Sequence, residues 1–234
     1  MLFRSRRDFE LGGEAARCRY ALEQAGRGHR VALICSGDAG IYAMAALVFE
    51  LLDRGAGLSD AAQRIEVVCA PGVSALQGAA ALAGAPLGHD FCAISLSDLL
   101  TPREEIVKRV RAAAVGDFVI AFYNPVSKRR RTLLAEARDI LLEHRGADTP
   151  VMLATSLGRP GEHIRYRRLA DLDVDEVDML TVVLVGSTQS KLVARGDGAR
   201  MYTPRGYARK IDGGLAAGSD AFGEGILAKK KGAS

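Results

Sequence analysis

The segment CSGDAGIY at positions 35–42 combines glycines with a single carboxylate, a pattern that could bind a small ligand. It follows the apolar run 31–34 and precedes an apolar helical pattern at 43–52. In α/β proteins, a buried strand that breaks at glycines and restarts as a helix forms a ligand cradle lined by backbone groups. The alternative is an ordinary strand-to-helix connection in which Ser36 or Asp38 caps the helix.

Three other segments with glycine, proline or polar residues also follow stretches that we expect to be strands. They are APGVSALQ at 70–77, AFYNPVSKRR at 121–130 and ATSLGRPGE at 154–162. Basic residues cluster in the second half, at 128–131 and at 165–168. Such clusters usually lie on a solvated face, and they would also suit a polyanionic partner.

The composition is that of a protein with substantial hydrophobic cores. The chain has 234 residues, of which 48% are hydrophobic, enough for one large domain or two small ones. We find no window of 18 apolar residues and no leader pattern, so we expect a cytoplasmic protein without a membrane or nucleic-acid partner. The four cysteines show no metal-ligand spacing, so we expect no metal.

Apolar runs of strand length alternate with helical patterns, which is typical of an α/β fold. A strand, a glycine turn and a helix occur twice in the first half, which favours a parallel sheet there. Strands follow one another more closely in the second half, which favours a mixed sheet. The expected strands are 31–35, 65–69, 91–95, 117–123, 151–155, 162–169 and 180–185. The expected helices are 8–26, 41–54, 73–83, 101–114 and 131–144.

The change of pattern indicates two domains. We place the boundary near 87–90, between an N-terminal domain at 1–88 and a C-terminal domain at 89–212. The tail at 213–234 is rich in glycine and contains a run of lysines, and we expect it to be disordered.

Taken together with PLGHDFCAISLSDLLTP at 86–102 and YTPRGY at 202–207, the four ligand-type segments resemble the tetrapyrrole methylase family, in the family's order and spacing. The resemblance extends from Glu14 to Tyr207, and it is greatest to members that act in cobalamin biosynthesis. It implies a two-domain α/β fold with S-adenosylmethionine held between the domains as methyl donor. It also implies a precorrin tetrapyrrole as substrate and a homodimer as the usual assembly.

The resemblance further implies which residues would contact the donor. The first domain would line the donor largely with main-chain groups, and the second domain would close the pocket. The positions that match the family's donor-binding motifs are Ser36, Gly37, Asp38, Ile41, Ser74, Ala75, Tyr123, Asn124 and Leu157.

The substrate that the resemblance implies carries many carboxylates, which favour basic side chains at the rim of a cleft because a guanidinium pairs with a carboxylate in a bidentate way. Lys128, Arg129 and Arg130 follow an expected pocket strand and are our candidates for this contact. The alternative is that these three residues lie on a solvated surface.

These family members also contract the macrocycle, which requires proton transfer. His89 and Asp90 are our candidates for general acid or base, because they lie together at the expected domain junction and imidazole titrates near neutrality. The alternative is a structural hinge in which Asp90 orients His89.

The chain departs from the family's pattern at its start. Members begin with a strand and a GxGPG loop, followed by another strand, and we find neither before Arg17. We therefore expect the first sheet to lack a central strand, which would expose unpaired backbone and apolar surface.

Other functions remain open at this point. Another methylase of the same fold would keep the donor segments and change the substrate motifs. A nicotinamide dehydrogenase is disfavoured, because we find no GxGxxG loop with an acidic residue suitably placed after it. A non-catalytic fragment or subunit could bind a tetrapyrrole or a partner without turnover.

Overall fold

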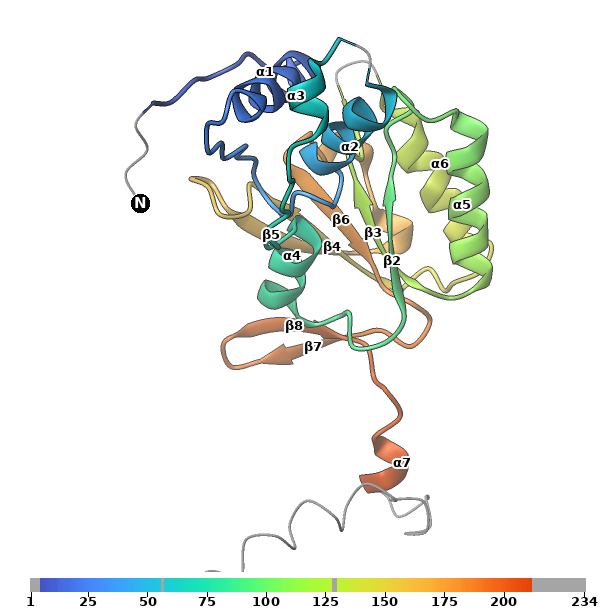
Figure 1. The fold of residues 1–234 in the computed structure, drawn as a ribbon. Coiled ribbons are helices and arrows are strands. Elements are labelled where there is room, and N and C mark those ends of the chain that lie inside the picture. The colour runs from blue at the N-terminus through green and yellow to red at the C-terminus, as the bar shows by residue number, and fades with distance from the viewer. Residues whose placement is uncertain (1–4, 56, 128–129, 212–234) are drawn as a thin grey trace, which may run out of the picture.

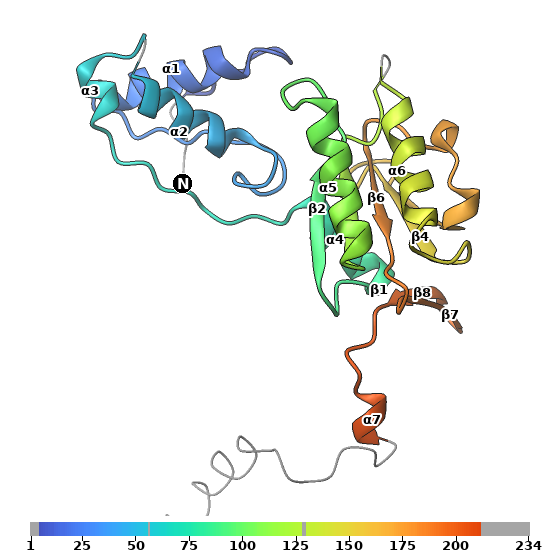
Figure 2. The same ribbon diagram turned by 90° about the vertical axis from the view of Figure 1, so that its right-hand side faces the viewer.

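The computed structural model describes residues 5–55, 57–127 and 130–211 of the chain. The helices before residue 64 lie together, and one irregular segment leads from them to a body of two sheets with flanking helices (Figure 1; Figure 2). The tail at 213–234 lies outside the described residues, as do the candidate residues Lys128 and Arg129.

The larger sheet combines five strands of the second half. They are β2 (Phe91–Ser95), β3 (Val119–Tyr123), β4 (Pro150–Thr155), β5 (His163–Arg168) and β6 (Thr181–Val185). Their order is β2-β3-β6-β4-β5. β2 runs parallel to β3, whereas the other neighbouring pairs are antiparallel. The mixed sheet expected in this half is therefore confirmed.

Helices cover both faces of this sheet (Figure 1). One face packs against α5 (Arg103–Val115) and α6 (Thr132–Leu142), and the other packs against α4 (Ala75–Ala83). The sheet is thus the middle layer of a three-layer α/β body, which confirms the fold class.

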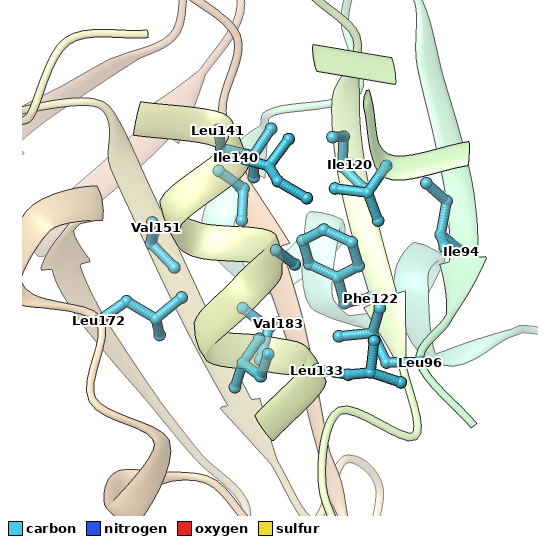
Figure 3. Packing of buried hydrophobic residues seen from close by; sticks show 14 of the residues in the cluster. Ile94, Leu96, Ile120, Phe122, Leu133, Ile140, Leu141, Val151, Leu172 and Val183 are labelled. Carbon is cyan, nitrogen blue, oxygen red and sulfur yellow. The ribbon is translucent and has the colours of Figure 1, made fainter. Parts of the chain in front are cut away.

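Side chains of the central strands alternate between two buried clusters. Ile120 and Phe122 of β3 point into the cluster on the α5 and α6 side, which Figure 3 shows. Val119 and Ala121 of the same strand point into the cluster on the α4 side. Because both faces are buried, the central strands are continuous apolar runs, and the sequence predicts them well.

A smaller sheet, in the order β1-β8-β7, was not predicted. Its strands are β1 (Gly84–Ala85), β7 (Lys191–Arg195) and β8 (Gly198–Tyr202). β7 and β8 form a hairpin in which Arg195 pairs with Gly198, so Gly196 and Asp197 make the turn. A two-residue turn of this composition between short strands is a hairpin signal that the sequence did contain.

Hydroxyl groups fasten the smaller sheet to the chain before β2. Thr203 Oγ1 donates to the Pro86 carbonyl oxygen at 2.6 Å and lies 2.7 Å from Ser190 Oγ. Gly88 packs so closely here that a Cβ would lie 2.7 Å from the Thr203 carbonyl oxygen. The segment before β2 is thereby held against the residue that follows β8.

The helices before residue 64 share a small core. The helices are α1 (Glu14–Gly26), α2 (Met44–Arg54) and α3 (Asp60–Gln63). Their shared core contains Cys18, Leu22, Met44, Val48, Leu51, Leu58 and Ala62.

The strands expected at 31–35 and 65–69 are not formed, which corrects the parallel sheet predicted for the first half. Neither segment pairs with a strand in the part of the chain that the structure describes. One side of each segment packs against the helical core, while Ile34 and Val68 are 70% and 81% exposed. Packing on one side accounts for the apolar residues of these segments, but a strand also needs a neighbouring strand to which its backbone is hydrogen-bonded.

The expected helices are all present, with later starts in the first half. α1 begins at Glu14 rather than at residue 8, and α2 begins at Met44 rather than at residue 41. The remaining short helices are η1 (Leu169–Asp171), η2 (Val174–Glu176) and α7 (Ala208–Ile211). Within the described ranges, no helix is long and apolar enough to cross a membrane.

The packing of α4 bears on the expected domain boundary. This helix precedes residue 88, yet Leu76, Ala79 and Ala83 pack against the sheet of the second half. By sequence α4 belongs to the expected N-terminal domain, but its buried side chains pack in the core of the expected C-terminal domain. The division at 88 stays a prediction.

Candidate functional site

Asp38 joins the two glycine-containing segments of the first half. Its carboxylate accepts from the Gly40 amide at 2.8 Å and from the Gly72 amide at 2.9 Å. These two bonds, that to Gly72 first, hold the pKa of Asp38 below its ordinary value. The helix-capping alternative is wrong for Asp38, because α2 follows Ala43 and has no side-chain cap.

Gly72 shows how closely the two segments approach. A Cβ at this position would lie 2.2 Å from the Gly37 carbonyl oxygen and 3.1 Å from the Asp38 Cα. Any larger residue would force the segments apart. Sequence reasoning did not single out Gly72, although the Pro71-Gly72 pair marked a break in the chain.

Tyr123 brings the end of β3 to the start of α4. Its hydroxyl oxygen lies 2.6 Å from Ser74 Oγ and accepts from the Leu76 amide at 2.8 Å. Ser74 is buried and forms a capping box with Gln77, whose Oε1 accepts from the Ser74 amide at 2.8 Å. The predicted residues Ser74, Ala75 and Tyr123 are therefore neighbours in the fold.

Tyr42 is a further residue of this site that the prediction did not name. Its hydroxyl donates to the Ala93 carbonyl oxygen at 2.9 Å, and its ring centroid lies 5.0 Å from that of Tyr123. Burial is the main cause that raises the pKa of Tyr42. Its place in CSGDAGIY was the available signal.

An apolar pocket of about 480 Å³ lies beside these contacts. It is lined by Gly40, Ile41, Tyr42, Ala43, Ala46, Leu76, Phe91 and Ala93. The volume is within the range of small-molecule sites, and the lining residues lie on both sides of the expected domain boundary at 88. Ile41, which was predicted to contact the donor, is part of the lining.

Asn124 and Leu157 lie at the same end of the sheet as Tyr123. Asn124 Nδ2 donates to Ser95 Oγ at 3.0 Å, across the ends of β3 and β2. Leu157 follows β4 and packs in the cluster that contains Leu76 and Tyr123. Since β2, β3 and β4 all end at one edge of the sheet, Tyr123, Asn124 and Leu157 lie at that edge.

Arg130 is held by side chains of its own half. Its Nη1 donates to Ser97 Oγ at 2.6 Å and lies 3.4 Å from Asp98 Oδ1, and its Nε donates to Ser127 Oγ at 3.1 Å. The guanidinium therefore fastens the loop after β3 to the loop after β2, and 27% of the side chain remains exposed.

His89 and Asp90 lie at the other end of β2. They precede Phe91, whereas the donor residues cluster where β2 and β3 end. His89 Nδ1 accepts from the Asp90 amide at 2.8 Å and lies 3.3 Å from Asp90 Oδ2, and both side chains are largely exposed. The pair is thus next in sequence to Phe91, which lines the pocket together with Gly40 and Ile41. It does not lie at the strand ends with Tyr123 and Asn124.

The family model for Tetrapyrrole (Corrin/Porphyrin) Methylases matches residues 3–173. The chain belongs to the tetrapyrrole methylase family. The resemblance seen in the motifs is thereby confirmed, as is the two-domain α/β fold class, apart from the first-half strands described above.

Individual relatives of this methylase support the same placement. A cobalt-factor III methyltransferase of Priestia megaterium is 47% identical over 197 residues, which are 84% of this chain but 35% of the relative. A precorrin-3B C(17)-methyltransferase of Sinorhizobium sp is 45% identical over 196 residues, which are 83% of this chain and 76% of the relative. The crystal structure of the methyltransferase CobJ has 42% identity and a TM-score of 0.72, and covers 82% of this chain and 77% of that one.

The chain thus spans about a third of the length of one of these relatives and about three quarters of the other. Among the residues that the structure describes, His, Cys, Asp and Glu side chains form no group that could hold a metal ion.

Proposed function

We propose that this tetrapyrrole methylase is an S-adenosylmethionine-dependent precorrin-3B C(17)-methyltransferase of cobalamin biosynthesis. It would methylate carbon 17 and contract the ring to give precorrin-4. The identity of 45% to a relative with that name supports the proposal.

The observation that carries the proposal is the joining of donor segments from both halves. Asp38 ties segment 35–42 to Gly72, and Tyr123 ties the end of β3 to Ser74. An apolar pocket lies beside these contacts. These contacts between segments far apart in the sequence support a donor site between them.

The chemistry of the pocket fits a sulfonium methyl donor. When bound, S-adenosylmethionine supplies an electrophilic methyl group and leaves as a neutral thioether. An apolar wall favours that loss of charge, and the nearby Asp38 carboxylate favours a cationic ligand in the ground state. The chain's own groups therefore need to position the reactants rather than to supply a strong base for the transfer.

The donor would contact the positions carried over from the family motifs. We propose Ser36, Gly37, Asp38 and Ile41 on one side of it, Ser74 and Ala75 at the start of α4, and Tyr123, Asn124 and Leu157 on the sheet side. The gathering of Tyr123, Asn124 and Leu157 at one sheet edge supports this assignment.

The substrate side rests on fewer contacts. We propose that Lys128, Arg129 and Arg130 meet carboxylates of the tetrapyrrole, with Arg130 using the part of its guanidinium that Ser97 and Asp98 leave open. We propose His89 and Asp90 as the proton-transfer pair for ring contraction. Their exposure allows exchange with solvent, and they precede Phe91, which lines the pocket beside the donor segments.

A second candidate is the same methyl transfer on the cobalt-containing counterpart of the substrate. The identity of 47% to a cobalt-factor III methyltransferase favours it.

We also propose a cytoplasmic homodimer that binds neither nucleic acid nor membranes. The family's usual assembly supports the dimer, and sedimentation or light scattering would test it. A monomer at micromolar concentration would overturn this part of the proposal.

The function is tested by incubating the protein, expressed from its complete gene, with S-adenosylmethionine and either precorrin-3B or cobalt-factor III. Mass spectrometry should find one added methyl group on one of the two tetrapyrroles. A matched reaction without donor controls for oxidation of the substrate. If neither tetrapyrrole gains a methyl group, the proposal is wrong.

A further inference from the structure

Tyr42 ends the segment 35–42 in a backbone conformation that a bulky residue rarely adopts. Its φ is 52°, in the left-handed region where Cβ is crowded by the backbone. Glycine tolerates this region without strain, as Gly37 does at φ 79° in the same segment. A tyrosine persists there when its side-chain contacts compensate for the strain.

The first such contact is to the outer strand of the sheet. Backbone groups of Asp90 and Leu96 bond to the β3 segment. Backbone groups of alternate residues along a strand point to opposite sides, so the odd-numbered Ala93 directs its carbonyl oxygen away from β3, to the open edge of β2. The Tyr42 hydroxyl donates to this oxygen at 2.9 Å. A backbone group on an open edge is thereby satisfied by a residue of the first half.

The second contact is to Tyr123. The two rings are tilted by 48° with centroids 5.0 Å apart, a favourable aromatic geometry. Because the Tyr123 hydroxyl contacts Ser74 Oγ and the Leu76 amide, the pair of tyrosines connects segment 35–42, the start of α4 and the sheet.

These contacts span the apolar pocket. Gly40 and Ile41, which precede Tyr42, line one part of it, and Phe91 and Ala93 of β2 line another. The bond from Tyr42 to Ala93 therefore fixes the distance between parts of the lining that come from different halves of the chain.

We propose that Tyr42 is a positioning residue of the donor site. It holds the Gly37–Ile41 segment against the open edge of β2, so that the donor contacts of the two halves keep their spacing. This inference rests on the proposed function for the identity of the ligand, while the mechanical part concerns the protein without ligand.

The variant Tyr42→Phe keeps the ring and removes the bond to Ala93. We expect S-adenosylhomocysteine to bind about three- to tenfold more weakly in calorimetry, while the melting temperature changes little. Tyr42→Gly accepts the backbone conformation and removes both contacts, so its binding should be weaker again. Tyr166→Phe is the matched control, because Tyr166 is also partly buried and donates to a carbonyl oxygen, that of Ala199, away from the pocket.

Hydrogen exchange separates this inference from the proposed function. The amides of Gly40, Ile41 and Ala45 are hydrogen-bonded within the segment, so they report its opening without ligand. Tyr42→Phe should speed their exchange about three- to tenfold, and Tyr166→Phe should leave it unchanged.

Unchanged exchange in Tyr42→Phe overturns the inference, whether or not the donor binds. Faster exchange with unchanged donor affinity also overturns it, because the contact would then be structural only. If the wild-type protein binds no donor, the proposed function fails while exchange still decides the mechanical part.

Discussion

Asp38 is an acidic residue whose role in the structure is set by two backbone amides. The bonds to Gly40 and Gly72 replace the helix cap that its position in the sequence also allowed. A local motif contains the glycines and the carboxylate, but the partner Gly72 lies 34 residues away. Sequence reasoning could therefore identify Asp38 and could not identify its bond.

Replacing Asp38 by asparagine should weaken donor binding by about tenfold, because one amide then faces an NH₂ group instead of a carboxylate oxygen. Asp53→Asn, an exposed carboxylate on α2, is the control and should bind normally. Calorimetry with S-adenosylhomocysteine measures both. Equal affinity in Asp38→Asn and the wild type would remove the carboxylate from the account.

The pH dependence of the Asp38 bonds to Gly40 and Gly72 follows from the lowered pKa of Asp38. A carboxylate with a depressed folded pKa stabilises the fold fully above its unfolded value of about 3.9, and the contribution is lost as pH falls through the folded value. Asp38 should therefore cause no change in donor affinity between about pH 5 and 8. Donor affinity measured across that pH range checks this expectation. A step in affinity that Asp38→Asn abolishes would contradict it.

His89 was predicted from its residue type and from the expected junction, and the structure places it before β2, at the opposite end of that strand from Tyr123 and Asn124. His89→Ala should accordingly leave donor affinity unchanged and slow the formation of ring-contracted product by about 100-fold, within the usual range for a general acid or base. Calorimetry and a timed product assay measure the two effects. A full rate of ring contraction would leave His89 with a structural role.

At the scale of single elements, the start of α4 combines stability with the site. Ser74 and Gln77 form its capping box, and Ser74 also contacts the Tyr123 hydroxyl. The helix and its cap were predicted, because a serine before an apolar helical pattern is a local signal. The contact with Tyr123 was not derivable from local pattern, since it depends on how α4 packs on the sheet.

Ser74→Ala should lower the free energy of unfolding by about 1 kcal/mol and also weaken donor binding. The matched control is Ser59→Ala, because Ser59 caps a different helix, α3, through its bond from the Ala62 amide. Both variants should lose similar stability in urea titrations, but Ser59→Ala should keep its donor affinity. Similar donor affinity in the two variants would show that the Ser74 cap stabilises α4 without contributing to donor binding.

The strands show where element-level prediction succeeds. β2, β3 and β4 are apolar runs that both predict a strand and find paired neighbours. The segments 31–35 and 65–69 have the same texture, but no strand pairs with them within the described part of the chain. The apolar pattern of a segment predicts that it is buried. Whether it forms a strand also depends on a neighbouring strand, which the pattern does not identify.

For the molecule as a whole, Arg145 ties several elements together. Its guanidinium is fully buried, and it donates to carbonyl oxygens of Gly186, Phe118 and Ala113 from β6, β3 and α5 or their ends. Burial lowers the pKa of this group, with Asp117 acting in the opposite sense. Removing it would leave buried carbonyl groups without their donor.

Arg145→Ala should destabilise the protein by about 3 to 5 kcal/mol, which corresponds to a fall in melting temperature of roughly 10 °C. Arg111→Ala is the control, since Arg111 forms an exposed pair with Glu143 and such pairs contribute little. Calorimetric melting measures both variants. A small effect at Arg145 would show that the ends of the sheet are held by other contacts.

The family was predictable at this scale because several motifs occur together in a fixed order, which single loops would not have allowed. The pairing of β1 with β8 and the Arg145 contacts were not predictable, since their bonds join β1 to β8 and the segment after α6 to the segment after β6 across long stretches of chain. Site residues found by motif agree with the geometry best where a hydrogen bond links the two halves.

The central claim is that segments from both halves form one donor site at the end of β2 and β3. A crystal structure of the protein with S-adenosylhomocysteine tests it most directly. The account predicts that the ligand contacts the Asp38 segment, the start of α4 and Tyr123 together. A ligand bound elsewhere, for example in the separate pocket lined by Tyr166 and Arg167, would contradict the account.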